Sequence, residues 1–151
     1  MTRQGDAIGA LEDPLEQNKN LIRRFFDEMW NPWDFAKADE LLAPGIVFQG
    51  TLGSELRGRD AFRAYMRKVQ SAFPDFHNSI LEMTVEDDRV VARTFYRGTH
   101  RGEIFGLAPT GKSISYAGAA FFRIRDKQVI EGWVLGDLLG LLRQLGARTL
   151  P

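Results

Sequence analysis

The strongest constraint in this chain is its division into a helical first half and a β-rich second half. Apolar residues recur at helical spacing in residues 14–30, 34–42 and 59–73, and a short strand is expected at residues 46–50. Four longer strand-like runs then follow, near residues 76–86, 89–99, 113–124 and 128–137. This order predicts an α+β fold in which the helices pack on one face of a curved, mainly antiparallel sheet that surrounds a pocket.

Length and composition predict one domain without a charged or membrane partner. The 151 residues, 44% of them hydrophobic, fit a single domain at residues 14–147, with a flexible arm at 1–13 and a tail at 148–151. Twenty Lys and Arg balance twenty Asp and Glu, so no electrostatic feature favours nucleic acid or an anionic membrane. Neither a membrane-spanning run nor a signal-peptide pattern is evident, so a cytoplasmic protein is expected.

The sequence also gives no reason to expect a metal or a cofactor. It has no cysteine, and its two histidines, His77 and His100, are not part of a metal-ligand motif. It lacks a glycine-rich loop of the type that binds nucleotide phosphates between a strand and a helix. Any chemistry is therefore expected to be cofactor-independent.

A carboxylate near the C-terminus is the leading catalytic candidate. On an extended strand alternate residues share a face, so Glu131, Trp133, Leu135 and Asp137 point the same way. If that face is the core face, Asp137 lies at the end of an aromatic surface, where burial would make it a stronger base. Alternatively, Asp137 caps the helix that starts at Leu138.

Two basic residues are further candidates. Arg93 could hold an enolate oxygen or pair with a carboxylate such as Asp137 or Glu131, although an arginine on a strand is more often solvated on the outer face. His100 ends a strand beside the long loop of residues 100–112 and could transfer protons. The alternative for His100 is a loop histidine on the rim or surface.

Aromatic residues are numerous enough to form both a core and a pocket wall. Tyr65, Tyr96 and Tyr116 could also donate hydrogen bonds from their hydroxyls. The strands are apolar on both parities, which favours a homodimer through the sheet's outer face. The residues expected to bind a hydrophobic small molecule are Phe26, Trp30, Phe48, Tyr65, Tyr116, Phe122, Trp133 and Leu141.

Several segments, taken in order and spacing, resemble the SnoaL-like polyketide cyclases, also called ester cyclases, of the nuclear-transport-factor-2-like superfamily. The resemblance covers about residues 18–147. It implies a cone-shaped fold, a hydrophobic carbonyl-containing substrate, and Asp137 as general acid/base of an aldol-type ring closure. A histidine that assists this aspartate in the family is replaced here by Ala120. The segments that carry the resemblance are residues 18–26, 38–44, 98–103, 105–111 and 131–146.

The resemblance leaves other activities open. Related limonene-epoxide hydrolases place an Arg and an Asp two residues apart on a strand, and Phe95 replaces that Asp here, which disfavours epoxide hydrolysis. A ketosteroid-isomerase-like enzyme is a further alternative. A non-catalytic protein that binds a small molecule is the alternative from another class, since one fold hosts both. An Asp137 buried beside an open cavity would favour the enzyme, and a filled core with Asp137 only capping its helix would favour the binding protein.

Overall fold

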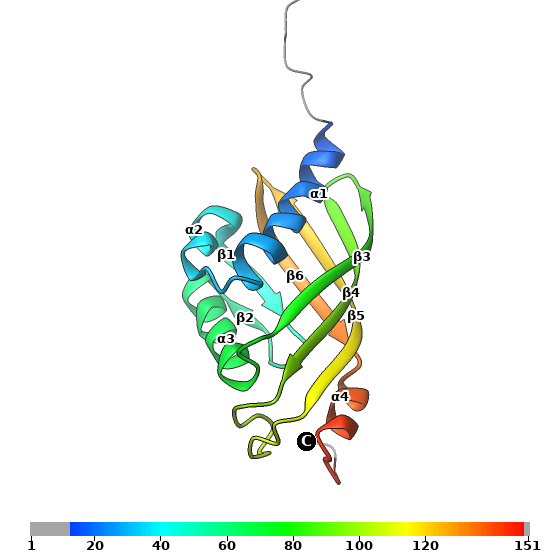
Figure 1. The fold of residues 1–151 in the computed structure, drawn as a ribbon. Coiled ribbons are helices and arrows are strands. Elements are labelled where there is room, and N and C mark those ends of the chain that lie inside the picture. The colour runs from blue at the N-terminus through cyan, green and yellow to red at the C-terminus, as the bar shows by residue number, and fades with distance from the viewer. Residues whose placement is uncertain (1–12, 150–151) are drawn as a thin grey trace, which may run out of the picture.

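The computed structural model of the protein describes residues 13–149, so the expected arm, apart from Asp13, and the last two residues of the expected tail lie outside the described part. The fold is α+β, as predicted, with helices and a curved sheet (Figure 1). The elements are α1 (Pro14–Arg24), η1 (Phe25–Trp30), η2 (Phe35–Lys37), α2 (Ala38–Leu41), β1 (Leu42–Gln49), β2 (Leu56–Arg57), α3 (Arg59–Ala72), β3 (His77–Glu86), β4 (Arg89–Thr99), β5 (Ser113–Arg125), β6 (Gln128–Gly136) and α4 (Leu138–Gln144).

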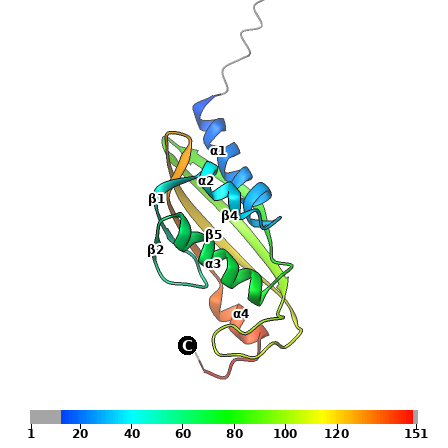
Figure 2. The ribbon, with the colours of Figure 1, turned by 90° about the vertical axis from the view of Figure 1, so that its left-hand side faces the viewer.

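The six strands form one curved sheet in the order β2-β1-β6-β5-β4-β3. All neighbouring pairs are antiparallel except β1 with β6, which are parallel. Helices α1, α2 and α3 lie on one face of the sheet, while α4 lies at the end where the loop between β4 and β5 also lies (Figures 1 and 2). Such one-sided packing buries the helices' apolar faces against the inner face of the sheet.

The first helix begins as its sequence predicts and then widens. The Asp13 carboxylate accepts the Leu15 N–H at 2.9 Å, and Pro14 occupies the first turn, where a missing N–H costs nothing. From Phe25 the helix becomes a π-helix, with the Asn31 N–H bonded to the Phe26 carbonyl at 2.8 Å. Such short π-helical stretches are frequent at functional sites. This stretch contributes Phe25, Phe26, Met29 and Trp30 to the core.

The segment between η1 and α3 differs from the prediction. Asp34 does cap a helix, accepting the Ala36 N–H at 3.2 Å, but the helix ends at Leu41. β1 begins at Leu42 rather than at residue 46, because its first residue pairs with Val129 of β6 before a break in register. The two-residue strand β2 was not predicted, being too short to show any alternation.

An extra residue in β6 reverses the face expected for its second half. Arg123 of β5 pairs with Glu131 and the next residue, Ile124, pairs with Val129, so Ile130 is bulged out of the ladder. A one-residue shift moves all following side chains to the opposite face. Val129 is therefore fully buried, whereas Trp133 is 44% exposed and Leu135 58% exposed. The condition that the face of Glu131, Trp133, Leu135 and Asp137 is the core face is therefore not met.

Small residues occupy several inner positions of β5 and β6. Ala120 pairs with Val134, and Gly118 with Gly136, all on the inner side of the sheet. Because these side chains are small, they leave space at the inner face of the sheet, and aromatic side chains fill this space. Within residues 13–149 no helix is long and apolar enough to cross a membrane.

A substitution at Gly132 tests how tightly the inner face of the sheet is packed. A Cβ at Gly132 would lie 2.6 Å from Cδ2 of Phe48, whose ring is held against Phe62 at 4.8 Å between centroids. We expect Gly132→Ala to lower the free energy of unfolding by about 1–3 kcal/mol, the usual cost of overpacking. Urea denaturation measures it. Gly45→Ala is the control, because nothing lies within 4 Å of the added methyl group there, and it should not destabilise; equal stability of the two variants would contradict the packing argument.

Candidate functional site

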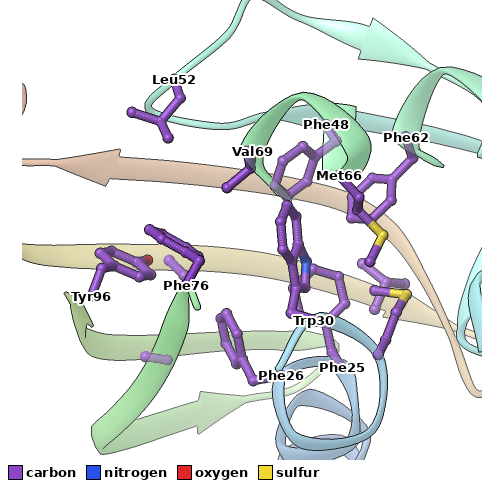
Figure 3. Close-up of a cluster of buried hydrophobic side chains, with 14 of the residues drawn as sticks. Phe25, Phe26, Trp30, Phe48, Leu52, Phe62, Met66, Val69, Phe76 and Tyr96 are labelled. Atoms are coloured by element: carbon purple, nitrogen blue, oxygen red, sulfur yellow. The ribbon is translucent and has the colours of Figure 1, made fainter. Parts of the chain in front are cut away.

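A cavity with about 380 Å³ of empty space, its opening included, lies between the sheet and the helices. The centre of a water molecule can occupy only about 30 Å³ of it, so a larger ligand requires lining side chains to move. Figure 3 shows part of the wall, with Phe76 and Tyr96 lying against each other. The cavity is lined by Phe25, Phe26, Trp30, Phe48, Gly50, Thr51, Leu52, Tyr65, Val69, Phe76, Asn78, Tyr96, Tyr116 and Val134, none of which carries a charge.

Three tyrosines supply most of the hydrogen-bonding groups of this wall. The Tyr96 hydroxyl accepts a hydrogen bond from the Thr94 hydroxyl at 2.7 Å, and the Tyr65 hydroxyl accepts one from the Leu52 N–H at 3.4 Å. The Tyr96 and Tyr116 ring centroids are 4.9 Å apart. Burial raises the pKa of Tyr96 to about 12 and also raises the pKa of Tyr65 and of Tyr116. All three are therefore neutral hydrogen-bond donors at physiological pH.

Glycines determine where these rings lie. A Cβ at Gly118 would lie 2.6 Å from Tyr96, and one at Gly136 would lie 2.8 Å from Tyr116. A Cβ at Gly50 would lie 2.1 Å from the Tyr65 hydroxyl oxygen. Real side chains never come so close, so each ring occupies space that is available only because the facing residue is glycine.

The opposite wall comes from the π-helical segment η1. Trp30 packs edge-on against Tyr65 with 5.8 Å between centroids, and Phe26 lies beside it (Figure 3). Asn31, directly after η1, is tied to β3: its side-chain oxygen accepts both the backbone N–H and the side-chain amide of Asn78, each at 2.9 Å. The Asn78 amide thus fixes η1 to the sheet, although it also borders the cavity.

The structure brings five of the eight predicted ligand-binding residues together around this cavity. Three others lie elsewhere. Phe122 is buried beneath the wall, 5.0 Å from Phe25 between centroids, and Leu141 is fully buried in α4. Trp133 lies on the outer face of the sheet against Phe121, at 5.5 Å. The residues that line the cavity as expected are Phe26, Trp30, Phe48, Tyr65 and Tyr116.

Asp137 lies outside the cavity. It is exposed, and its carboxylate accepts the Gly140 N–H at 2.8 Å, which makes it the N-cap of α4. Ala120, at the position expected for an assisting histidine, pairs with Val134 and not with Asp137. The inner position of β6 that could act together with residue 120 is therefore the apolar Val134, which borders the cavity.

Arg93 and His100 do not line the cavity either. Arg93 is exposed on the outer face of the sheet, and its Nε lies 2.9 Å from a carboxylate oxygen of Glu82 in β3. This is the solvated position expected as the alternative for an arginine on a strand. His100 is fully buried, contrary to both its expected exposure on a rim and a proton-transfer role at a pocket mouth. Its Nδ1 accepts the Thr110 N–H at 3.2 Å, which ties down the loop between β4 and β5, and its Nε2 has no hydrogen-bond partner among the described residues.

Sequence reasoning missed several lining residues, among them Leu52, Phe76, Asn78 and Val134, and treated Tyr96 only as a possible donor. Tyr96 and the buried Thr94 share the inner face of β4, and the signal for them is the strict alternation of this strand, in which Arg93 and Phe95 occupy the outer face. For Val134 simple alternation along β6 gives the wrong face, because the bulge at Ile130 shifts the register. Leu52 belongs to a loop, where periodicity gives no information.

The comparisons with known proteins agree with this architecture. The family model of the SnoaL-like polyketide cyclases matches residues 20–145. The chain belongs to this family, and its α+β fold is the cone of the nuclear-transport-factor-2-like superfamily. It is 32% identical over 108 residues to the aklanonic acid methyl ester cyclase DnrD of Streptomyces peucetius, covering 71% of this chain and 72% of that protein.

Two solved structures illustrate the similarity in three dimensions. TsrD from Streptomyces laurentii is 30% identical, with a TM-score of 0.79, covering 90% of this chain and 99% of that one. A protein from Jannaschia sp. CCS1, provisionally assigned as a SnoaL-like polyketide cyclase, has a TM-score of 0.82 at 26% identity, covering 91% and 97%. Both structures share the fold of this chain. Membership of the SnoaL-like polyketide cyclase family supports a cyclase-type role.

The raised tyrosine pKa values predict how stability depends on pH. In the unfolded chain a tyrosine loses its proton near pH 10, whereas folded Tyr96 keeps it up to about pH 12. Ionisation therefore favours the unfolded state between these values, so this contribution to the free energy of unfolding is complete below pH 10 and is lost as the pH rises toward 12. Urea denaturation at pH 8, 9.5, 10.5 and 11.5 measures it. Tyr96→Phe should show a shallower decline, and an identical pH dependence in both proteins would contradict the assignment.

Proposed function

We propose that the protein is a cyclase or isomerase that holds a hydrophobic, carbonyl-containing small molecule in the aromatic cavity. In this proposal the Tyr65 and Tyr96 hydroxyls donate hydrogen bonds to a carbonyl oxygen as it becomes an enolate. The observation that carries it is the combination of an uncharged aromatic wall with hydroxyls whose oxygens already accept a hydrogen bond from the protein. Their protons are then available to a ligand.

The chemistry needs few groups from the protein. An aldol-type closure removes a proton beside one carbonyl, forms a carbon–carbon bond to a second carbonyl carbon, and adds a proton to the resulting alkoxide. Donors in a water-poor cavity stabilise the enolate, and tight walls bring the two carbons together. Among residues 13–149 no carboxylate borders the cavity, so we propose water at its opening as the proton acceptor. A carbon between two carbonyls is the most acidic C–H of such a substrate, the tyrosine hydrogen bonds stabilise its enolate, and the water returns the proton to the alkoxide.

The role first expected for Asp137 does not enter this proposal. Its carboxylate caps α4 from an exposed position, and the cavity-facing residue on its strand is Val134. An acid/base must come within hydrogen-bond reach of the proton it moves, directly or through one water. We therefore assign Asp137 a structural function and the tyrosines the chemical one.

A binding protein without chemistry is the second candidate. It is favoured by the absence of a charged base among the lining residues and by the narrow space. The two candidates differ in one respect: a binding protein returns its ligand unchanged, whereas a cyclase releases a ring-closed isomer of the same mass.

A turnover assay tests the proposed activity. Because DnrD is named for acting on aklanonic acid methyl ester, that compound is the first substrate to test, followed by aromatic 1,3-dicarbonyl compounds. We expect Tyr65→Phe and Tyr96→Phe each to lower the rate of ring closure by about a hundredfold or more, the typical effect of losing an oxyanion donor. Chromatography of substrate and product measures the rate.

Asp137→Asn is the matched control, since asparagine can still cap α4. It should close the ring at the parent rate. An inactive Asp137→Asn protein with unchanged melting temperature would reject the tyrosine mechanism and restore Asp137 as the acid/base. Tight binding of the compounds without any isomer formed would favour the binding protein.

The outer face of the sheet supports a proposal about assembly. Apolar side chains from three neighbouring strands are exposed there: Phe95 (36%), Phe121 (42%), Trp133 (44%) and Leu135 (58%). The groove on this face also has both signs of charge, from Arg57, Arg89 and Arg123 and from Glu55 and Glu131. We propose that a second copy of the chain covers this face, because a surface that carries charges of both signs can complement itself across a twofold axis.

Light scattering tests the dimer directly. The parent protein is expected at about twice its chain mass of 17.1 kDa at micromolar concentration, and Trp133→Glu at the chain mass, because a buried unpaired charge disfavours association. Leu15→Glu, which changes an exposed leucine on α1, is the control and should remain dimeric. A parent protein that scatters as a monomer would overturn the proposal.

A further inference from the structure

We infer that Thr94 is a positioning residue that directs the proton of the Tyr96 hydroxyl into the cavity. This inference rests on the proposed function of the tyrosines and adds a residue to it. Thr94 does not border the cavity and would act only through Tyr96.

The Thr94 hydroxyl forms a hydrogen bond with the Tyr96 hydroxyl. Thr94 is fully buried on the inner face of β4, two residues before Tyr96, and its Oγ1 donates to the Tyr96 oxygen at 2.7 Å. A phenol oxygen that accepts this hydrogen bond keeps its own proton for another acceptor. Among residues 13–149 the structure shows no protein acceptor for that proton, and the cavity that Tyr96 borders can supply one in a ligand.

The Tyr96 ring has little freedom to point elsewhere. It stacks on Phe76 with 5.7 Å between centroids and 10° between the ring planes, and Tyr116 lies on it at 4.9 Å. Gly118 leaves room for the ring edge, and a Cβ there would also come within 3.1 Å of the Thr94 hydroxyl oxygen. The Tyr96 ring is therefore held in place by its neighbours, and rotation of the hydroxyl hydrogen about the C–O bond is the freedom that remains.

Thr94 also tunes the strength of the donor. Burial raises the pKa of Tyr96, and the Thr94 hydrogen bond lowers it, because it favours the phenolate. A phenol with a lower pKa donates a stronger hydrogen bond to an enolate oxygen. A purely structural threonine would satisfy its hydroxyl without any effect on the ligand.

The experiment compares Thr94→Val, which keeps the shape and loses the hydroxyl, with Thr94→Ser, which keeps the hydroxyl. The first readout is the pH titration of the Tyr96 ring carbon bonded to oxygen, followed by NMR in protein labelled at tyrosine. The second is the affinity for 2-naphthol, a planar probe whose oxygen can accept from Tyr96. The third is kcat and KM for ring closure.

We expect Thr94→Val to raise the pKa of Tyr96, to weaken 2-naphthol binding, and to lower kcat by about 3- to 10-fold, the effect of one hydrogen bond. Thr94→Ser should restore all three. If Thr94→Val does not fold, Thr94→Ala provides the same comparison. An unchanged Tyr96 titration and probe affinity in the folded variant would overturn the inference. If Tyr96→Phe leaves ring closure intact, the proposed function fails, whereas the titration and the probe still decide the role of Thr94.

Discussion

The seating of aromatic rings on glycines of the inner sheet face is the interaction on which the rest of this structure depends. Phe48 lies on Gly132, Tyr96 on Gly118 and Tyr116 on Gly136. Each missing side chain creates a depression that one ring fills, so close packing and ring orientation are set together. The cavity exists because these rings are held against the sheet and not in the space between sheet and helices.

This arrangement explains why the residues that line the cavity are uncharged. A wall of rings and small residues leaves little place for a solvated charge, and an unpaired charge would be costly there. Tyrosine is compatible with such a wall because its ring packs like phenylalanine while its hydroxyl remains a neutral donor. In the proposed reaction, such a site stabilises negative charge that develops on the substrate without carrying a charge of its own.

The sequence predicted the elements better than the site. Strong periodicity located α3 and the four long strands to within a residue or two, since alternation and turn residues such as Asp87 are local signals. The orientation of β6 could not be predicted, because the bulge at Ile130 depends on pairing with β5, which is distant in sequence. With that shift undetected, Trp133 and Asp137 were expected inside.

Glycines at the inner positions of β6 also contributed to the wrong orientation expected for this strand. Gly132 and Gly136 carry no hydrophobic signal, so the outer face of β6, with its Trp133 and Leu135, looked more like a core face than the true one. The same small residues are the ones that make room for Phe48 and Tyr116. The feature that forms the site is thus a lack of side chains, which pattern analysis cannot distinguish from a turn or a weak strand.

The central claim is that neutral tyrosine hydroxyls, and no carboxylate, polarise a carbonyl inside this cavity. The infrared C=O stretching frequency of bound 1-tetralone, an aromatic ketone, measures that polarisation directly. The account predicts a frequency lower than in hexane, restored toward the hexane value when Tyr65 and Tyr96 are both changed to Phe, and unaffected by Asp137→Asn. A frequency that ignores the two tyrosines, or that moves with Asp137, would contradict it.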